Sequence, residues 1–303
     1  MKKLIIWLAA IIGIVIAVDV LFGIAARAYI DRFHLKGDYR SVDHIVNDTT
    51  DRLVVIGSSV ALNSIDTGTL SDSLHIKAYN AGCNGQDFPY LLSLMEIIAG
   101  REDLDTVILG FTESSLTGTG LGSRYNFLIP YYHRGFDGID ERLEGGSAFE
   151  RLMLRSSLYR YNTIWFRILL YSFFEPGIPS GNGFIAKDIP SAFPNQYRVE
   201  ARDAVTPERA QEFDAFVRLC RDNGIRLIVC IPPQYELPAE PTPVEEFLCE
   251  RAATGDFELW LDNSSTPLSA DSTMFYDPVH LNYAGAEIYT DTVINRLSRP
   301  NEN

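Results

Sequence analysis

The feature that most constrains the fold is a series of short apolar runs, rich in β-branched residues and separated by helical patterns. Continuous apolar runs of this length are typical of strands in a parallel sheet that is covered on both faces. Alternating strands and helices predict a doubly wound, flavodoxin-like α/β/α sandwich that binds ligands at the carboxyl ends of its strands. The five predicted strands are Leu53–Ile56, Ile76–Asn80, Thr106–Gly110, Arg226–Ile231 and Phe257–Leu261.

Helical patterns lie between or after several of these strands. Phe88–Ala99 is the first, and the second runs from Thr206 to Asp222, with Thr206 as its N-cap and Pro207 at its first helical position. Tyr283–Leu297 is predicted to be a closing helix that Asn282 caps.

Residues 115–205, between the third and fourth strands, are too many for an ordinary connection and must hold structure of their own. This long insertion is rich in aromatic residues, and Asn162–Phe174 is predicted to be a helix that is apolar on most of its faces. Two interpretations remain open. The insertion is either an additional core packed on the sheet edge, or a lid or substrate-binding element near a membrane or a membrane partner.

The N-terminus has the pattern of a membrane anchor. Lys2 and Lys3 precede an apolar run, Leu4–Val18, which resumes at Val20–Ala26 after the single charge of Asp19. A cleaved signal peptide is the alternative, because Ala26-Arg27-Ala28 has small residues at the spacing that signal peptidase recognises. The length of the run, near the ~20 residues that span a bilayer, favours an uncleaved signal anchor.

These observations predict an anchor at residues 1–30, a juxtamembrane linker at 31–52, one catalytic domain at 53–297 and a tail at 298–303. The positive-inside rule places the lysines in the cytoplasm and the domain outside the cell membrane, in the periplasm or the extracellular space. A net charge of −14 argues against a nucleic-acid partner, which requires a basic surface.

The sequence predicts no metal site and no cofactor. Its four cysteines form no CxxC pair, and no histidine lies near them at zinc-ligand spacing. Cys220 and Cys230 fall in a predicted helix and strand, where thiols commonly serve as small core residues.

Two motifs far apart in the chain supply the groups that serine acyl chemistry needs. Near the C-terminus, Pro278 keeps Asp277 out of helical geometry, so that Asp277 and His280 can converge in a turn and the carboxylate can hold the imidazole tautomer. At the other end of the domain, the first strand runs directly into Gly57, Ser58 and Ser59. A hydroxyl there lies at the ligand-binding edge of the sheet.

Two further segments end strands with glycines and polar residues. In Asn80–Asp87, the glycines allow backbone conformations that direct N–H groups toward a common point, where they could stabilise an oxyanion. Gly110, Thr112 and Glu113 follow the third strand and again place a hydroxyl at this edge. Each segment by itself is equally compatible with a simple turn.

The order of these four segments resembles the SGNH (GDSL-like) hydrolase superfamily. The resemblance covers residues 53 to about 297, apart from the insertion, and makes Ser59 the nucleophile, Asp277 and His280 its Asp-x-x-His pair and Gly85 an oxyanion donor with the Ser59 N–H. The family's third block normally supplies an asparagine, which Thr112 replaces as a substitute donor.

The Gly-Ser-Ser variant, the anchor and the insertion are most similar to the membrane-anchored branch of that superfamily, which includes proteins of teichoic-acid D-alanylation and alginate acetylation. The resemblance implies a serine esterase or O-acyltransferase that acts on acyl esters, with acetyl favoured, of an envelope polysaccharide or glycan. It also implies a membrane-bound O-acyltransferase as a partner. The alternative is an inactive SGNH-like scaffold that binds a glycan or such a partner.

Overall fold

The structure is a computed structural model of the 303-residue chain. It describes residues 1–48, 50–118, 125–174, 182–188, 203–235, 241–263 and 266–299. It contains one five-stranded parallel sheet with the strand order β2-β1-β3-β4-β5, which confirms the predicted doubly wound α/β fold. The strands are β1 (Leu53–Gly57), β2 (Ala78–Asn80), β3 (Thr106–Gly110), β4 (Arg226–Ile231) and β5 (Glu258–Leu261).

The strand order reverses direction at β1, because the chain places β2 on one side of β1 and β3 on the other. In open α/β sheets, ligands bind at the carboxyl ends of the strands beside such a switch point. Gly57 and Gly110 are paired there in the β1–β3 register. A Cβ on Gly57 would lie 2.1 Å from the Gly110 carbonyl oxygen, so only glycine fits this close approach.

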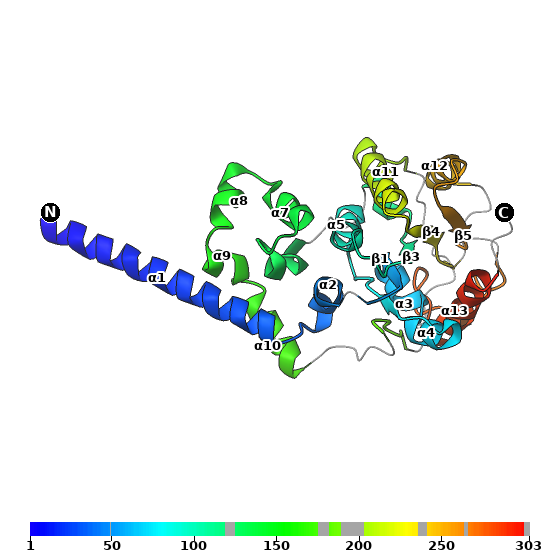
Figure 1. Cartoon of the computed structure of the whole chain (residues 1–303), viewed down its shortest axis with the longest axis horizontal. Coiled ribbons are helices and arrows are strands. Elements are labelled where there is room, and N and C mark those ends of the chain that lie inside the picture. Colours follow the sequence, from blue (N-terminus) through cyan, green and yellow to red (C-terminus); the bar gives the residue numbers. More distant parts are fainter. Residues whose placement is uncertain are drawn as a thin grey trace. The chain divides into compact units, whose positions relative to one another are not determined.

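Helices cover both faces of the sheet (Figure 1). Near one face lie α3 (Ser59–Ser64), α4 (Thr67–Leu74) and α13 (Tyr283–Leu297), and near the other lie α5 (Phe88–Ile98) and α11 (Pro207–Asp222). Helix α12 (Pro243–Ala252) contacts β5. The remaining elements of this part of the chain are α6 (Ser114–Thr117) and the 3-10 helix η4 (Ser272–Met274).

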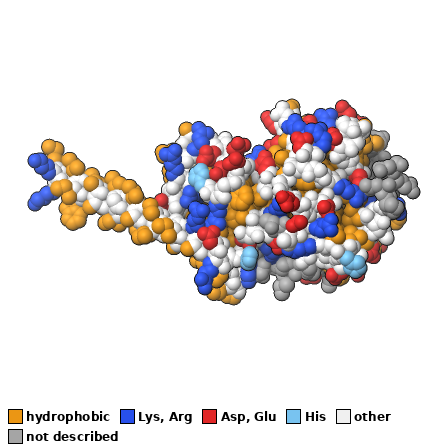
Figure 2. Space-filling view, viewed as in Figure 1, with side chains coloured by type: hydrophobic (Ala, Val, Ile, Leu, Met, Phe, Trp, Pro, Cys, Tyr) orange, Lys and Arg blue, Asp and Glu red, His pale blue; other side chains and the backbone are white. Residues whose placement is uncertain are grey.

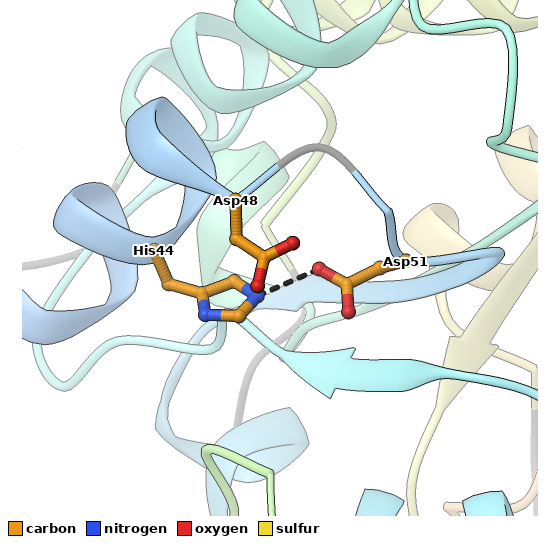
Figure 3. A group of neighbouring side chains, drawn as sticks. All are labelled: His44, Asp48 and Asp51. Atoms are coloured by element: carbon orange, nitrogen blue, oxygen red, sulfur yellow. Dashed lines mark hydrogen bonds and ion pairs between the residues drawn. The ribbon is translucent and has the colours of Figure 1, made fainter.

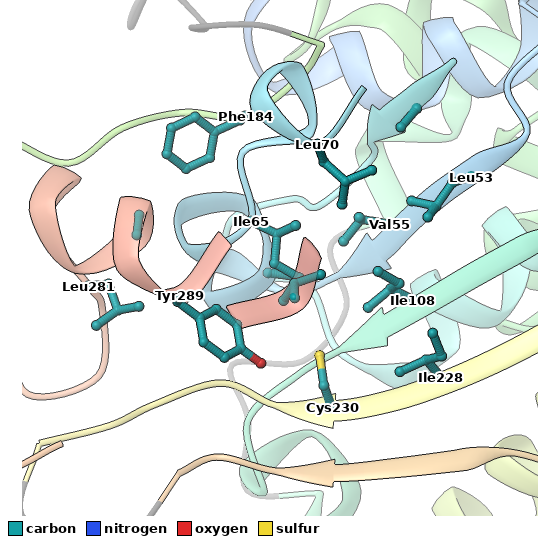
Figure 4. Close-up of a cluster of buried hydrophobic side chains, with 14 of the residues drawn as sticks. Leu53, Val55, Ile65, Leu70, Ile108, Phe184, Ile228, Cys230, Leu281 and Tyr289 are labelled. Atoms are coloured by element: carbon teal, nitrogen blue, oxygen red, sulfur yellow. The ribbon is translucent and has the colours of Figure 1, made fainter. Parts of the chain in front are cut away.

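The core beneath α3, α4 and α13 is built from alternate residues of the central strands (Figure 4). Val55, Ile108 and Ile228 contribute one side chain from each of three neighbouring strands, and Tyr289 of α13 covers them. On the other face, Phe88 of α5 makes an edge contact with Phe111 at 5.7 Å between ring centroids. Burial on both faces explains why the strands appear in the sequence as continuous apolar runs.

The predicted helix boundaries rest on capping residues that the structure places as expected. The Thr206 hydroxyl accepts a hydrogen bond from the Arg209 N–H at 3.3 Å, and Pro207 opens α11. The Asn282 side chain accepts from the Gly285 N–H at 3.0 Å and so begins α13. Both caps satisfy N–H groups that a helix cannot pair internally.

The chain divides into two compact units by its internal packing. The first unit comprises Met1–Asp43 and Tyr125–Pro176, and the second, which holds the sheet, comprises His44–Arg124 and Gly177–Asn303. Helix α2 (Arg40–Asn47) crosses the boundary between them. The helices of the first unit are α1 (Lys2–Arg32), η1 (Gly37–Tyr39), η2 (Tyr125–Phe127), η3 (Ile129–Tyr131), α7 (Asp137–Glu144), α8 (Ala148–Met153), α9 (Ser157–Tyr161) and α10 (Trp165–Phe173).

Helix α1 is long and apolar enough to cross a membrane, with a mean hydropathy of 2.9 over its most apolar 18 residues. Figure 2 shows apolar side chains over the first part of this helix, with the lysines at its tip. A helix of this kind near an N-terminus is compatible with either a membrane anchor or a signal sequence.

Candidate active site

Ser59 opens α3 immediately after the end of β1. The turn is tight because the Ser58 N–H donates to the Gly110 carbonyl at 3.0 Å, which ties the residue after β1 to the end of β3. Ser58 is buried, whereas Ser59 is half-buried. Of the two adjacent serines, Ser59 therefore presents the more accessible hydroxyl at the carboxyl edge of the sheet.

The side chain of Asn80 fixes the helix that carries Ser59. Its amide nitrogen donates to the carbonyl oxygens of Ala61 and Ile65, both at 2.9 Å, and its oxygen accepts from the Gly82 N–H at 2.9 Å. Asn80 is fully buried, so these hydrogen bonds hold its amide in a dry environment where an unpaired polar group would be costly. The sequence marked Asn80 only as part of a glycine-containing segment, and its positioning role becomes visible in the structure.

Asp277 and His280 lie in a short loop whose two ends are paired with each other. Phe275 and Leu281 form an isolated antiparallel bridge at the base of the loop. Within it, Asp277 Oδ1 accepts hydrogen bonds from the backbone N–H groups of Val279 and His280, both at 2.9 Å. Pro278 has no backbone N–H to donate, and it disfavours helical geometry at Asp277. Both effects favour the turn over a helix at this point of the chain.

The loop brings the histidine to the serine. His280 Nε2 lies 2.7 Å from Ser59 Oγ, and His280 Nδ1 lies 2.9 Å from each carboxylate oxygen of Asp277. Burial alone would raise the pKa of Asp277, but the hydrogen bond and charge of His280, with the two backbone donors, hold that pKa below its usual value. Asp277 is thus kept ionised beside the imidazole, and the three side chains form one hydrogen-bonded chain.

The two other predicted site residues are not joined to this chain by any hydrogen bond within the described part of the protein. Gly85 is exposed, and its φ of +66° lies in the left-handed region that favours glycine. The Thr112 hydroxyl lies 2.9 Å from that of Ser114. Both residues follow strands that flank β1, so they belong to the same edge of the sheet as Ser59.

A buried carboxyl group also lies after β3. Glu113 accepts a hydrogen bond from Asn263 Nδ2 at 3.3 Å, and the same nitrogen donates to Glu245 at 2.8 Å. Burial raises the pKa of Glu113 to about 7; a hydrogen bond with Thr242 opposes this rise, and the charge of Glu245 adds to it. Glu113 occupies the position after Thr112 and is committed to this internal network.

A second histidine–carboxylate cluster lies elsewhere in the sheet-containing unit (Figure 3). His44, Asp48 and Asp51 offer ligand atoms within 4.8 Å of one another, a spacing that could hold a metal ion. However, Lys77 Nζ lies 2.9 Å from both oxygens of Asp48 and 3.8 Å from Asp51 Oδ1, so the chain supplies a cation of its own. We therefore assign this cluster no metal.

Residues 182–188, which we call the strap, lie within the predicted insertion and bind the elements that carry the site, a role that the sequence did not indicate. The Asn80 N–H donates to the Asn182 carbonyl at 2.7 Å, and Asn63 Nδ2 donates to the Ile185 carbonyl at 2.7 Å. The Tyr283 N–H at the start of α13 donates to the Lys187 carbonyl at 2.9 Å. This strap therefore joins α3, which carries Ser59, to the helix that follows the His280 loop.

Comparisons with known proteins find only distant similarity. No protein-family model and no curated protein matches the sequence. A solved structure from Bacteroides fragilis, provisionally described as an acylhydrolase, is 12% identical with a TM-score of 0.42, over 84% of this chain and 90% of that chain. Another, from Streptococcus pneumonia and provisionally described as a platelet activating factor, is 9% identical with a TM-score of 0.43, over 96% and 98%. A functional assignment must therefore rest on the geometry of the site itself.

Proposed function

We propose that this chain is a membrane-anchored serine esterase or O-acyltransferase of the SGNH type, working through an acyl-enzyme on Ser59. The observation that carries the proposal is the hydrogen-bonded chain from Ser59 Oγ to His280 Nε2, at 2.7 Å, and from His280 Nδ1 to Asp277, at 2.9 Å. A nucleophile, a base and a group that orients the base are the parts that serine acyl transfer requires.

In the first half-reaction, Ser59 Oγ attacks the carbonyl carbon of an ester while its proton passes to His280 Nε2. The tetrahedral intermediate collapses, the alcohol leaves with that proton, and the acyl group remains on Ser59. In the second half-reaction, water or a sugar hydroxyl gives its proton to His280 and attacks the acyl carbon. Ser59 then recovers the proton. Asp277 holds the neutral imidazole in the tautomer that accepts at Nε2, and it stabilises the imidazolium that forms after each proton transfer.

The developing oxyanion would be received by the backbone N–H groups of Ser59 and Gly85. Ser59 lies in the first turn of α3, where backbone N–H groups have no acceptor within the helix. The third donor would be the Thr112 hydroxyl, which would have to leave or share its contact with Ser114. Because loss of one oxyanion donor typically costs a factor of ~10²–10³ in turnover, a poorly placed Thr112 would make this a slow enzyme.

The cellular setting of the proposal follows from α1. With Lys2 and Lys3 on the cytoplasmic side, the sheet-containing unit would face the periplasm or the exterior. The length of the apolar run in α1, near the ~20 residues that span a bilayer, favours an anchor over a cleaved signal. We propose acyl esters, with acetyl favoured, of an envelope glycan as substrates, and a membrane-bound O-acyltransferase as a partner.

The test compares two adjacent serines. Wild-type protein is expected to react with a fluorophosphonate probe and to hydrolyse a short-chain aryl ester, and Ser59→Ala is expected to do neither. Ser58→Ala is the matched control, because the Ser58 hydroxyl is buried and makes no hydrogen bond to any described residue. Labelling that persists in Ser59→Ala, or a wild type that neither labels nor transfers an acyl group to a glycan acceptor, would contradict the proposal and favour the inactive-scaffold alternative.

A further inference from the structure

The charge that interrupts the apolar run of α1 is bound by the chain itself. Asp19 accepts hydrogen bonds from the Ser156 hydroxyl at 2.7 Å and from the backbone N–H groups of Leu158, at 2.7 Å, and Ser157, at 3.2 Å. The carboxylate therefore caps the start of α9 from a neighbouring helix. A charged residue inside an apolar anchor is expensive in a membrane unless it has partners such as these.

Close packing continues along α1 beyond Asp19. A Cβ on Gly23 would lie 2.2 Å from Ser157 Oγ, so the small residue at this position lets α9 approach α1 closely. The Trp165 ring of α10 makes edge contacts with Phe22 and Tyr29, each at 5.5 Å between ring centroids. The last part of α1 is thus an integral element of the first unit, and α9 and α10, which we call the interfacial helices, are attached to it.

Helix geometry gives the depth of this attachment in a bilayer. At 1.5 Å per residue, Asp19 lies about 22 Å along α1 from Leu4, and Tyr29 lies about 38 Å from it. The hydrocarbon core of a bilayer is about 30 Å thick, and about 40–45 Å with its headgroups. If α1 spans the membrane with Lys2 and Lys3 at the cytoplasmic surface, the interfacial helices lie between the outer part of the core and the outer headgroups.

Helix α10 has an exposed apolar stripe at helical spacing. Phe166, Leu170 and Phe173 are 74%, 40% and 79% exposed, whereas Ile168 on the packed face is 2% exposed. Arg167 lies beside the stripe with half of its side chain exposed. A stripe of large apolar residues with a neighbouring arginine is typical of helices that lie in the membrane–water interface.

We propose that the interfacial helices are seated in the outer leaflet, with Phe166, Leu170 and Phe173 in contact with lipid. Asp19 fastens them to the anchor through the start of α9. The inference rests on the membrane anchoring in the proposed function and is independent of the chemistry at Ser59. A lipid surface is the occupant that the depth of the attachment favours, because α10 packs on the part of α1 that emerges from the hydrocarbon core.

The test uses the full chain in lipid nanodiscs with a Cys249→Ser background, which removes the exposed cysteine. An environment-sensitive fluorophore is placed by Phe173→Cys, and quenching by lipids with a spin label on the acyl chain is measured. Glu141→Cys on α7 is the polar control in the same unit, since Glu141 is exposed. Several-fold stronger quenching at 173 than at 141 is expected, and equal quenching at the two positions would overturn the proposal.

Three further variants separate the possible failures. A label at Ile11→Cys reports on the anchor alone: quenching there without quenching at 173 contradicts the seating of the interfacial helices, and no quenching at either contradicts the anchor. Asp19→Leu removes the acceptor of the hydrogen bonds from the start of α9 and is expected to reduce quenching at 173 while the label at 11 remains quenched. Asp19→Asn keeps an acceptor oxygen and is expected to retain most of the signal. Identical behaviour of Asp19→Leu and wild type would overturn the role of Asp19. Fluorophosphonate labelling of the same samples reports separately on Ser59.

Discussion

The sheet-containing unit holds two histidine–aspartate pairs that resemble each other closely at first sight. His280 Nδ1 lies 2.9 Å from Asp277, and His44 Nε2 lies 2.6 Å from Asp51. Both histidine side chains are 21% exposed. Neither the hydrogen bond to a carboxylate nor the exposure of the ring therefore distinguishes a reactive site from a structural one.

The surroundings of the two rings differ. The second nitrogen of His280 faces the Ser59 hydroxyl at 2.7 Å, whereas the ring of His44 stacks on Tyr79 with centroids 3.4 Å apart and planes 5° from parallel. The carboxylate of Asp51 is 1% exposed and lies near Lys77, while that of Asp277 is 32% exposed. The second ring nitrogen of His280 therefore meets a hydroxyl group at the carboxyl edge of the sheet, whereas the ring of His44 packs on Tyr79.

The largest expected effect separates the two histidines. His280→Ala removes the proposed base and should lower kcat/KM for an aryl ester by a factor of ~10³ or more. His44→Ala should leave kcat/KM within a few-fold of wild type, because its ring is held by Tyr79 and Asp51. Steady-state kinetics on both purified variants measure this contrast, and a comparable loss in His44→Ala would erase the distinction between the two pairs.

Substitution of the two aspartates should show the same contrast in activity as substitution of the two histidines, with a smaller loss. Asp277→Asn preserves the shape of the side chain and removes the charge that holds the His280 tautomer, so kcat should fall by ~10²–10⁴. Asp51→Asn should leave kcat unchanged and lower the free energy of unfolding by ~1–3 kcal/mol, because a buried hydrogen-bonded charge is lost. Paired kinetics and chemical denaturation test this, and an unstable Asp277→Asn with normal kcat would reverse the assignments.

The sequence was sufficient for the sheet because burial acts on each strand separately. Val54, Val55 and Ile56 are fully buried, and such continuous apolar runs can be recognised without knowing their neighbours in space. The caps at Thr206 and Asn282 are equally local, since each residue pairs with a backbone N–H only three positions later. Elements of this kind were predicted to within two residues.

Contacts between distant residues could not be predicted in this way. Ser59 and His280 are 221 positions apart, and only the order of motifs suggested that they meet. The strap at residues 182–188 forms no helix or strand of its own, and its backbone accepts hydrogen bonds from Asn80 and from Asn63 of α3, more than a hundred positions earlier. His44 and Asp51 fall in the predicted linker. Asp19 interrupts the apolar run of the predicted anchor, and its partners lie more than a hundred positions away in the sequence.

The smallest expected effect concerns Lys77, the cation beside the cluster of His44, Asp48 and Asp51. Burial alone would raise the pKa of Asp48, but its hydrogen bonds with Lys77 hold that pKa well below the usual value. A carboxyl whose pKa is lowered in the folded state contributes stability above its unfolded pKa and loses that contribution as the pH falls through the folded value. Lys77→Met keeps the length of the side chain and removes the charge, so the variant should be less stable than wild type at pH 7 by about 0.5–1 kcal/mol.

The pH dependence of that difference decides its cause. If the ion pair is responsible, the gap in melting temperature between Lys77→Met and wild type should shrink as the pH falls below ~4, where Asp48 in the variant and in the unfolded chain takes up its proton. A gap that stays constant from pH 7 to pH 3 would instead assign the effect to packing of the lysine stem. Ester hydrolysis at pH 7 should be equal in the two proteins. Lys77 binds Asp48 in the second cluster and has no contact with Ser59 or His280 among the described residues.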